Sequence, residues 1–547
     1  MPQPRVLFCG VIICSLCASI QSPASAQSLV EVHPDVRYFP EIDPTVAIHC
    51  ADDGQQAYLP PSFDPARRIE RDAANLARGA SGGFDAFIST GFTPPDPEIA
   101  AGPNHVVVIV NGGIAFFQHD GTLDFSRSIN GSAGFWGDVG ATNFVFDPEA
   151  TFDPASGRYF VMANERTDPS GFEESYFVLA VSDDDDPNGT WHKYRFDVTP
   201  EGAGGAGGGS IDSPNMAITD DAVYLGADFT FNGRYLLYIV EKAAVLIGAA
   251  PVTTDTIFFN SGASGLPRVI GQPPRMYMIH NRTNQSVRLS AILDPLTAPT
   301  RVTFDLVIPP YALGSEAPPQ MGGAAEPTTF GSRFWSSEWR DGSLWAVHHQ
   351  NTTRVLARWY EIHTNGWPDS GNDPTLAQSG EIDPGPDLRT FFPAIGSDEC
   401  GNAMVVFARS SPSEFISIWA ATRHAGDPLG TLRAPFLVRE TTAYYQFTRW
   451  GDYGGIEADP VVGERFWTHH EYTLDGTNWL TWVAPLVARP RGDLTGDDAV
   501  TLEDVEPFVA LLLDEDVPAS ELCTADMNRD GDLNGADVAP FTARILE

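Results

Sequence analysis

The amino-acid sequence predicts a mainly β protein with a small helical part at its C-terminal end. Between about residues 86 and 487, short runs of Val, Ile, Phe, Tyr and Trp alternate with Asp, Gly, Pro and Asn, and no stretch keeps a helical period. A single β-sandwich cannot absorb about 400 residues, whereas six to eight four-stranded blades can. The sequence therefore predicts a β-propeller over 86–488, with seven blades favoured and two tandem sandwiches as the alternative.

The first twenty-six residues have the composition of a secretory signal peptide. One basic residue, Arg5, precedes an apolar segment over 6–20, and Ala24 and Ala26 stand before Gln27. No later apolar run approaches the roughly 20 residues that a membrane-spanning helix needs. We therefore expect an exported protein, secreted or at the cell surface, without a transmembrane segment in the mature chain. Residues 27–85 form an N-terminal extension.

Charge and cysteine content limit the partners and the cross-links. A net charge of -39 disfavours nucleic acid and anionic membrane surfaces. Three cysteines follow the predicted cleavage point: Cys50, Cys400 and Cys523. In an oxidising compartment two of them can pair, and a Cys50–Cys400 pair would join the two ends of the large domain.

Residues 489–547 contain one pattern twice, at 493–504 and at 526–537. Side-chain oxygens recur at loop positions 1, 3, 5, 9 and 12, and position 7 offers a backbone carbonyl, as in loops that wrap calcium. Gly531 occupies the sharp turn at position 6 of the second loop, whereas Asp498 replaces it in the first. The predicted metal ligands are Asp493, Thr495, Asp497, Ala499, Thr501, Asp504, Asp526, Asn528, Asp530, Asp532, Asn534 and Asp537.

A short apolar segment follows each loop, with Pro and Phe at the same offset in both copies. A proline so near the start of a helix is tolerated, because the first amides have no partner inside the helix. Two loop-then-helix units that end in Asp, with no helix entering the first loop, resemble a type I dockerin domain of the planctomycete-type variant over 492–547. The alternative interpretation is an acidic, disordered tail.

The dockerin resemblance implies calcium-dependent folding and a cohesin-like or other envelope protein as partner. Dockerin-like domains of this variant often carry a cysteine inside the first loop. Here that position is Gly496, so the resemblance implies that Cys523 is left unpaired.

The large domain is similar to a group of exported bacterial propellers of poorly defined activity. The resemblance rests on Pro-Pro-Asp-Pro-Glu-Ile-Ala-Ala-Gly-Pro-Asn-His at 94–105, Phe-Asp-Pro-Ala-Ser-Gly-Arg-Tyr at 152–159, Arg-Trp-Gly-Asp-Tyr at 449–453 and Phe-Trp-Thr-His-His-Glu-Tyr at 466–472. The turns at 182–191 and 473–479 resemble the Asp-box turns of sialidase blades, which fold a hairpin over a tryptophan. These features support the fold more than any reaction.

The densest polar and aromatic cluster of the large domain is at 449–453. In a functional interpretation, Arg449 and Asp452 lie at the mouth of the central channel and Trp450 is a platform for a sugar ring. In the favoured alternative, Arg449 binds Asp452 within a blade-closing turn and Trp450 belongs to the core.

Two histidine pairs and one acidic turn invite a metal interpretation. Neighbouring side chains on a strand point to opposite faces, so 348–349 and 469–470 each offer one ligand at most to a single site. We therefore favour structural histidines. The acidic turn at 183–186 is interpreted as a solvated turn rather than a calcium site.

Two functional classes remain open for the propeller, and its catalytic residues are unknown. We narrowly favour a binding or scaffold domain with a carbohydrate or protein ligand, because the sequence identifies no catalytic constellation. The alternative is a glycoside hydrolase that acts on polysaccharide and is attached through its dockerin. Two carboxylates facing each other across the channel would favour the hydrolase, because glycosidases use such a pair.

Overall fold

The computed structural model describes residues 82–167, 174–199, 211–229, 234–259, 265–313, 316–323, 325–351, 354–514 and 516–546. The predicted signal peptide, nearly all of the predicted extension and Cys50 lie outside the described residues. The described strands form seven sheets, which are the blades of a seven-bladed propeller. The predicted fold class is therefore confirmed.

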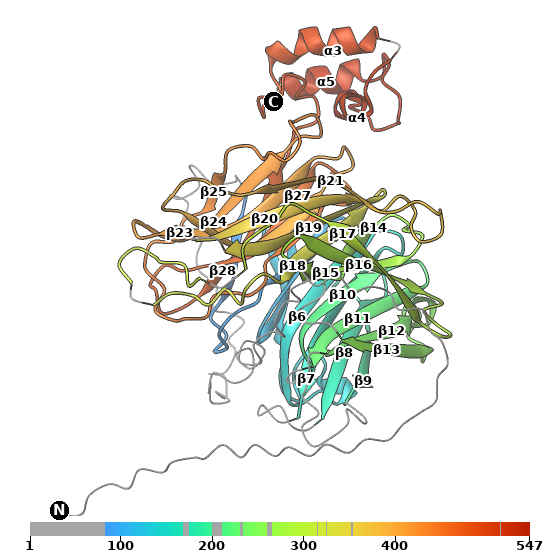
Figure 1. Cartoon of the computed structure of the whole chain (residues 1–547), viewed down its shortest axis with the longest axis vertical. Helices are drawn as coiled ribbons and strands as arrows, with labels where there is room; N and C mark the ends of the chain where they lie inside the picture. Colours follow the sequence, from blue (N-terminus) through green and yellow to red (C-terminus); the bar gives the residue numbers. More distant parts are fainter. Residues whose placement is uncertain are drawn as a thin grey trace, which may run out of the picture. The chain divides into compact units, whose positions relative to one another are not determined.

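Each of the first three blades contains four antiparallel strands that follow one another along the chain (Figure 1). Their strands are β2 (Glu98–Ala101), β3 (His105–Val110), β4 (Gly113–Gln118), β5 (Leu123–Ser128), β6 (Phe144–Asp153), β7 (Arg158–Arg166), β8 (Ser175–Ser182), β9 (Trp191–Asp197), β10 (Ile211–Ile218), β11 (Ala222–Phe229), β12 (Arg234–Glu241) and β13 (Thr253–Phe259). A 3-10 helix, η1 (Gly137–Val139), precedes β6, and a short helix, α2 (Lys242–Val245), follows β12.

Blades four and five are linked by a strand that crosses between them. β14 (Arg268–Ile270) precedes the strands of blade four but pairs in parallel with β18, the inner strand of blade five. The strands of blades four to six are β15 (Met276–Thr283), β16 (Ser286–Leu293), β17 (Thr300–Val307), β18 (Phe334–Arg340), β19 (Ser343–Asn351), β20 (Val355–His363), β21 (Thr375–Glu381), β22 (Arg389–Ser397), β23 (Ala403–Ser411), β24 (Glu414–Arg423) and β25 (Phe436–Arg439).

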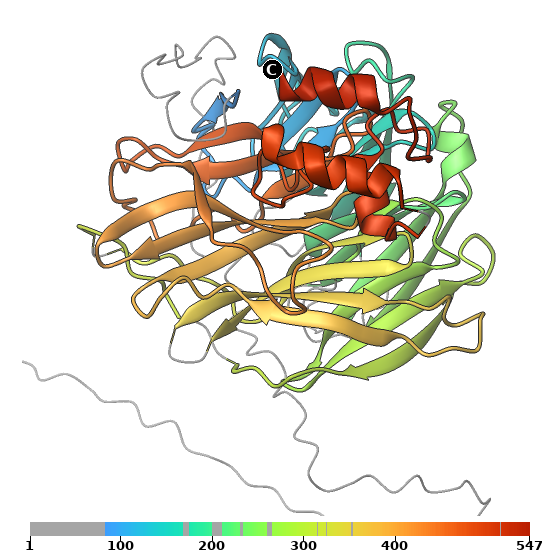
Figure 2. The same cartoon turned by 90° about the horizontal axis from the view of Figure 1, so that it is seen from above.

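Blade seven closes the ring with strands from both ends of the propeller. β26 (Gly455–Ala458), β27 (Arg465–Tyr472) and β28 (Leu480–Val487) are joined by β1 (Phe84–Ile88), which pairs antiparallel with β28. The inner strands contact one another in the order β2, β6, β10, β14, β18, β22 and β26, and β26 contacts β2. In Figure 2 the colours accordingly progress around the propeller until the orange strands return beside the blue ones.

Apolar side chains fill the spaces between neighbouring blades. In β3, Val106 and Val108 pack in a cluster shared with blade seven, whereas Val107 and Ile109 pack in a cluster shared with blade two. The two faces alternate because successive side chains on a strand point to opposite sides of the sheet. Burial of both faces explains why β3 reads as a nearly continuous apolar run in the sequence.

Several inner strands share one irregularity at the end where the chain enters them. In β6, β10 and β22 the register shifts across a residue that precedes a proline: Asp147, Ser213 and Phe392. These residues have φ between 46 and 49°, and Asp96, just before β2, has φ 49° and also precedes a proline. Such bulges re-aim side chains at a sheet edge. Here they occur at equivalent places around the central channel.

The C-terminal residues form a short 3-10 helix, η2 (Leu502–Asp504), and three helices, α3 (Val505–Leu512), α4 (Ala519–Ala525) and α5 (Val538–Ile545) (Figure 1). Phe508 of α3 and Phe541 of α5 stack with their ring centroids 4.0 Å apart. Both rings are buried, together with Ala525 of α4. The two repeats therefore pack against each other through the phenylalanines at equivalent positions.

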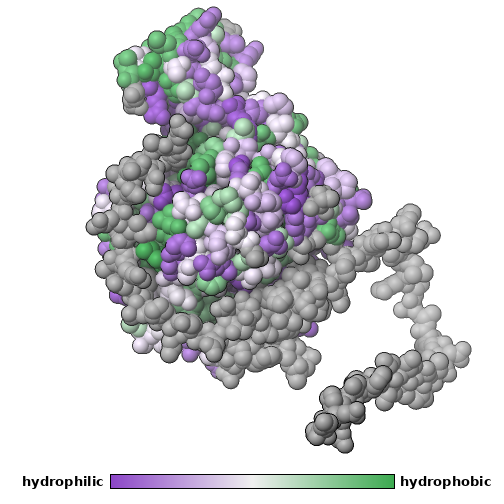
Figure 3. Space-filling view, turned by 90° about the vertical axis from the view of Figure 1, so that its left-hand side faces the viewer, coloured by the Kyte–Doolittle hydropathy of each residue, from purple (hydrophilic) through white to green (hydrophobic). Residues whose placement is uncertain are grey.

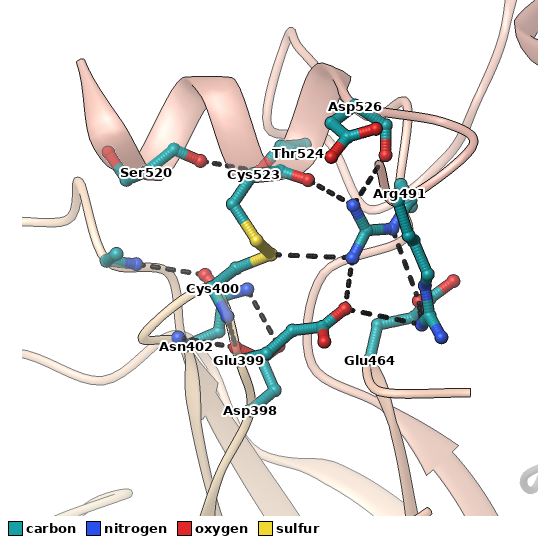
Figure 4. The surroundings of a disulfide bond; sticks show 12 residues. Asp398, Glu399, Cys400, Asn402, Glu464, Arg491, Ser520, Cys523, Thr524 and Asp526 are labelled. Carbon is teal, nitrogen blue, oxygen red and sulfur yellow. Dashed lines mark hydrogen bonds and ion pairs between the residues drawn. A yellow bond between two sulfur atoms is a disulfide. The ribbon is translucent and has the colours of Figure 1, made fainter. Parts of the chain in front are cut away.

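A disulfide joins Cys400, in the turn between β22 and β23, to Cys523 in α4 (Figure 4). The expected Cys50–Cys400 pair and an unpaired Cys523 were therefore wrong. The sequence placed Cys523 only relative to its own module, whereas its partner lies 123 residues away in a propeller turn.

Buried and half-buried arginines surround the disulfide. Arg491 forms an ion pair with Glu399 and donates to the Asp526 carbonyl at 2.6 Å, and Arg529 of the second loop pairs with Glu464 at 2.8 Å (Figure 4). Arg433, which precedes β25, donates to the Gly496 carbonyl of the first loop at 2.6 Å. Both loops are therefore held against turns of blades six and seven.

Among the described residues, no helix is long and apolar enough to cross a membrane.

Candidate functional site

Four aspartates from four successive blades gather where the inner strands begin. Asp452 precedes β26, Asp96 precedes β2, Asp147 is in β6 and Asp212 is in β10. We call these residues the entry cluster. Asn111 connects two of them, because its side-chain amide donates to Asp96 at 2.7 Å and its side-chain oxygen accepts from the Asp147 backbone at 2.8 Å.

The entry cluster carries more carboxyl groups than cations that pair with them directly. Arg449 Nη2 lies 2.6 Å from Asp452 Oδ2, and Arg166 Nη2 lies 3.4 Å from Asp212 Oδ2. Burial, reinforced by the neighbouring Asp452, raises the pKa of Asp96 to about 8. Burial and the nearby Asp212 and Asp96 raise the pKa of Asp147 well above its usual range. The cluster can therefore hold a protonated carboxyl beside ionised ones at neutral pH.

Trp450 does not serve as a platform for a sugar ring. It is only 3% exposed and packs edge-on against Tyr445 with ring centroids 5.1 Å apart. The favoured interpretation of 449–453 is therefore confirmed for Trp450, while Asp452 does reach the entry cluster. The half-buried aromatic side chains near this end are Trp335 and Tyr453, whose rings lie 6.2 Å apart.

Farther along the inner strands from the entry cluster, the central channel contains a cavity of about 40 Å³. Its lining includes Glu98 of β2, Glu149 of β6, Arg268 of β14 and Trp335 and Ser337 of β18. A cavity of this size has room for a few water molecules or one hydrated ion. It is too small for a sugar residue, so a polysaccharide would have to bind elsewhere on the propeller.

A larger cleft of about 290 Å³ lies between blades three and four, at the opposite ends of their inner strands. Asp220 and Asp221 come from the turn after β10, and Gln272 and Arg275 from the segment before β15. The buried ring of Tyr224 contributes to the apolar part of the lining. Arg275 is oriented by Asp369, whose two oxygens accept from it at 2.7 and 3.0 Å.

The paired histidines are structural. His348, His349, His469 and His470 are all buried, and burial lowers the pKa of each to about 3. Their ring nitrogens contact groups of the core: His348 Nε2 lies 2.8 Å from the Tyr360 hydroxyl, and His469 Nδ1 lies 3.0 Å from the Glu98 carbonyl.

The turns between β8 and β9 and between β27 and β28 have the expected Asp-box character. Trp191 donates to the Pro187 carbonyl at 2.8 Å, and the buried Trp479 donates to the Phe92 carbonyl at 2.6 Å. Acidic side chains at 183–186 accept hydrogen bonds from backbone amides of the same turn. Asp183, for example, accepts from the Thr190 amide at 2.8 Å. Their role is therefore to shape the hairpin.

In the C-terminal module, the first and last aspartates of each loop are buried. Asp504 accepts from the Leu494 and Thr495 amides at 2.7 and 2.8 Å, and Asp537 accepts from the Met527 and Asn528 amides at 2.8 and 3.2 Å. At position 6 of each loop, Asp493 accepts from the Asp498 amide at 3.1 Å, and Asp526 from the Gly531 amide at 2.9 Å. The two loops therefore have the same internal geometry.

The donor set of these loops fits calcium. Burying four carboxylates is costly when too few positive charges lie beside them. Calcium would supply such charge, because it takes carboxylate, amide, hydroxyl and carbonyl oxygens in flexible geometry. The twelve loop residues predicted as ligands lie within the loops, and Asp498 and Gly531 at position 6 have φ of 68° and 89°. The position-6 residue therefore has the left-handed backbone that the tight turn needs.

His424 of the propeller lies beside the first loop, a neighbour that the sequence did not indicate. Its Nε2 is 3.0 Å from Asp498 Oδ1 and 3.1 Å from the Ala488 carbonyl. His424, Asp493 and Asp498 place one ligand atom each within 4.8 Å of one another. Arg433 also approaches Asp498, at 3.4 Å, so these contacts are part of the junction between module and propeller.

No protein-family model matches the chain, and no curated protein matches it. Among solved structures it is similar to the Hadza microbial sialidase Hz136, with 10% identity, a TM-score of 0.35 and coverage of 72% of this chain and 65% of that chain. A Trypanosoma rangeli sialidase in complex with sialic acid has 12% identity, a TM-score of 0.35 and coverage of 81% and 64%. An exo-beta-1,3-galactanase from Clostridium thermocellum has 10% identity, a TM-score of 0.29 and coverage of 74% and 100%.

The chain thus spans less than two thirds of the length of the two sialidases. The assignment of the large domain as a seven-bladed propeller rests on the seven sheets themselves.

Proposed function

We propose that this chain is an exported modular protein whose propeller binds a carbohydrate and whose C-terminal module docks, in a calcium-dependent way, to an envelope protein. The observation that carries the docking part is the duplicated loop: in both copies the carboxylates of positions 1 and 12 are buried and accept amides of their own loop. The module is a dockerin-like domain in this proposal, and a cohesin-like receptor is its partner.

An exposed apolar surface of the module supports a protein partner. The exposed apolar residues are Leu502 of η2, Val505 and Val509 of α3, Leu513 just after α3, Val538 of α5 and Leu546 just after α5. Figure 3 shows apolar residues gathered on one side of these helices. Exposed apolar residues that cluster in this way are typical of interaction surfaces. Val505 and Val538 occupy equivalent positions of the two repeats, as do Leu513 and Leu546.

The cleft between blades three and four supports a carbohydrate ligand. Its volume of about 290 Å³ is close to the lower end of the range for small-molecule sites. The carboxylates of Asp220 and Asp221, the amide of Gln272 and the guanidinium of Arg275 offer both acceptors and donors to hydroxyl groups. We therefore place a monosaccharide or disaccharide unit of a polysaccharide in this cleft.

The test is to incubate the full chain with a panel of soluble and insoluble polysaccharides and to measure both protein depletion and new reducing ends. Depletion without new ends, lost in Arg275→Ala and retained in Arg288→Ala, would support the binding function. Arg288 is a matched control because it forms a similar exposed ion pair, with Asp305, on another part of blade four. Absence of depletion across the panel would contradict a carbohydrate ligand.

A second candidate function, glycoside hydrolysis, is favoured by one observation: the raised pKa values of Asp96 and Asp147 beside other carboxyls of the entry cluster. A protonated carboxyl next to an ionised one is the acid–base arrangement that glycosidases use. However, these aspartates come from neighbouring blades and three of them are buried, so they are not an open pair across the channel. New reducing ends that disappear in Asp147→Asn would make hydrolysis the function.

A further inference from the structure

The cavity in the central channel is lined by two glutamates at equivalent positions of neighbouring blades. Glu98 and Glu149 each end an Asp-Pro-Glu sequence, and each opens the regular part of an inner strand after the entry irregularity. Both side chains line the same cavity of about 40 Å³. Two adjacent blades therefore direct carboxyl groups into one small space.

The nearest cation is already paired with another carboxylate. Arg268 Nε lies 3.1 Å from Glu457 Oε1, whereas Arg268 Nη2 is 3.9 Å from Glu98 Oε2. Glu457 is in turn held by the Thr151 hydroxyl at 2.7 Å and the Ala101 amide at 2.5 Å. One guanidinium thus faces both Glu457 and Glu98, and Glu149 in the same cavity adds a third carboxyl group.

A hydroxyl group in the lining supplies an independent indication of a ligand. Ser337 is only 6% exposed, and its Oγ has no hydrogen-bond partner among the described residues. Ser337 also lines the cavity, on the strand that faces Gly265. An unsatisfied buried hydroxyl is costly, so a polar species in the cavity would complete its hydrogen bonding or take it as a ligand.

We propose that the central cavity binds one divalent cation, Ca²⁺, between Glu98 and Glu149, with Ser337 and water completing the shell. This site is separate from the two loops of the C-terminal module. Two carboxylates balance the double charge, and the polar lining is rich in oxygen donors, which suit Ca²⁺. The volume leaves room for the ion and a few water molecules. The ion would bind the inner strands of blades one, two and five together.

The test is the calcium stoichiometry of the full chain, measured by isothermal titration. To separate the sites, the titration is repeated in the Asp504→Ala/Asp537→Ala variant, in which both module loops are disabled. This variant is the loop-disabled background. We expect three ions in the wild type, one in this background, and none when Glu98→Gln and Glu149→Gln are added. Glu440→Gln is the matched control, because it removes an exposed propeller carboxylate away from the cavity and should leave the one ion bound.

Terbium gives a second measurement, because Trp335 lines the cavity and can sensitise Tb³⁺ emission there. Emission should persist in the loop-disabled background and fall at least tenfold in Trp335→Phe. A loop-disabled chain that is folded and binds no calcium would overturn the proposal. If the added double substitution prevents folding, Glu149→Gln alone in the wild-type chain must lower the stoichiometry from three to two, and an unchanged value would contradict the site.

Discussion

Cys400 in the propeller and Cys523 in helix α4 form a disulfide between a β-turn and the C-terminal module (Figure 4). The ion pairs of Arg491 with Glu399 and of Arg529 with Glu464 lie around it. The C-terminal module is therefore not joined to the propeller by a free linker alone, because one covalent bond and several ionic contacts hold it against blades six and seven.

Removal of the disulfide is expected to uncouple the module from the propeller. Linking residues 123 positions apart restricts the unfolded chain by roughly 4–5 kcal/mol in the loop-entropy model. Calorimetry of Cys400→Ser/Cys523→Ser should show an added, earlier transition for the module, and reduced wild type should behave in the same way. A single transition at the wild-type temperature would show that the ionic contacts alone hold the module.

Gly531 is expected to be essential for the second loop. Its φ of 89° is in the left-handed region, where a side chain is strained even though open space surrounds the position. Gly531→Ala should weaken the module by about 1–2 kcal/mol. Gly535→Ala is the control, because this glycine of the same loop has open space and no positive φ. Calcium titrations followed by circular dichroism would compare them, and equal midpoints would contradict the expectation.

The Phe508–Phe541 stack is expected to carry much of the stability of the module. Phe541 is 3% exposed in a core of very few buried side chains. Phe541→Ala should destabilise the module by about 3–5 kcal/mol. Leu546→Ala, at a position that is 80% exposed, should change stability by less than about 0.5 kcal/mol. Chemical unfolding of both variants in calcium would test this, and similar midpoints would argue against the stack.

Acid is expected to lower the part of the propeller's stability that comes from its buried neutral histidines. Burial lowers the pKa of His348 to about 3, against an ordinary value of 6.5. Below pH 6.5 the unfolded chain therefore binds a proton that the folded chain does not, and the free energy of unfolding falls by up to about 1.4 kcal/mol per pH unit down to pH 3. The free energy of unfolding in urea, measured between pH 4 and 7, should fall less steeply with decreasing pH in His348→Gln than in the wild type. His363→Gln, at an exposed position, should keep the wild-type dependence on pH.

The strand pattern was enough to predict a propeller, because blades buried on both faces require short apolar runs at regular intervals. The repeated loop pattern was equally visible, since each copy lies within twelve consecutive residues. The entry cluster was not predicted, because Asp452, Asp96, Asp147 and Asp212 come from four blades and meet only when the ring closes. A local signal did exist: the repeated Asp-Pro-Glu at 96–98 and 147–149 marks two aspartates with the same positive φ where an inner strand begins.

Long-range pairing accounts for the other differences. Cysteine count and module resemblance could not identify Cys400 as the partner of Cys523, because that choice depends on how the module packs against a turn of blade six. The burial of Trp450, which the favoured interpretation of 449–453 did predict, follows from its contact with Tyr445 in the segment before β26.

Hydrogen exchange of the full chain, with calcium and with a chelator, tests directly whether calcium folds the C-terminal module. We expect calcium to protect the amides of residues 493–504 and 526–537, and the chelator to expose them together with α3 and α5. The outer strands of the propeller should exchange at the same rate in both conditions. Equal protection of the two loops with and without calcium would contradict a calcium-folded docking module.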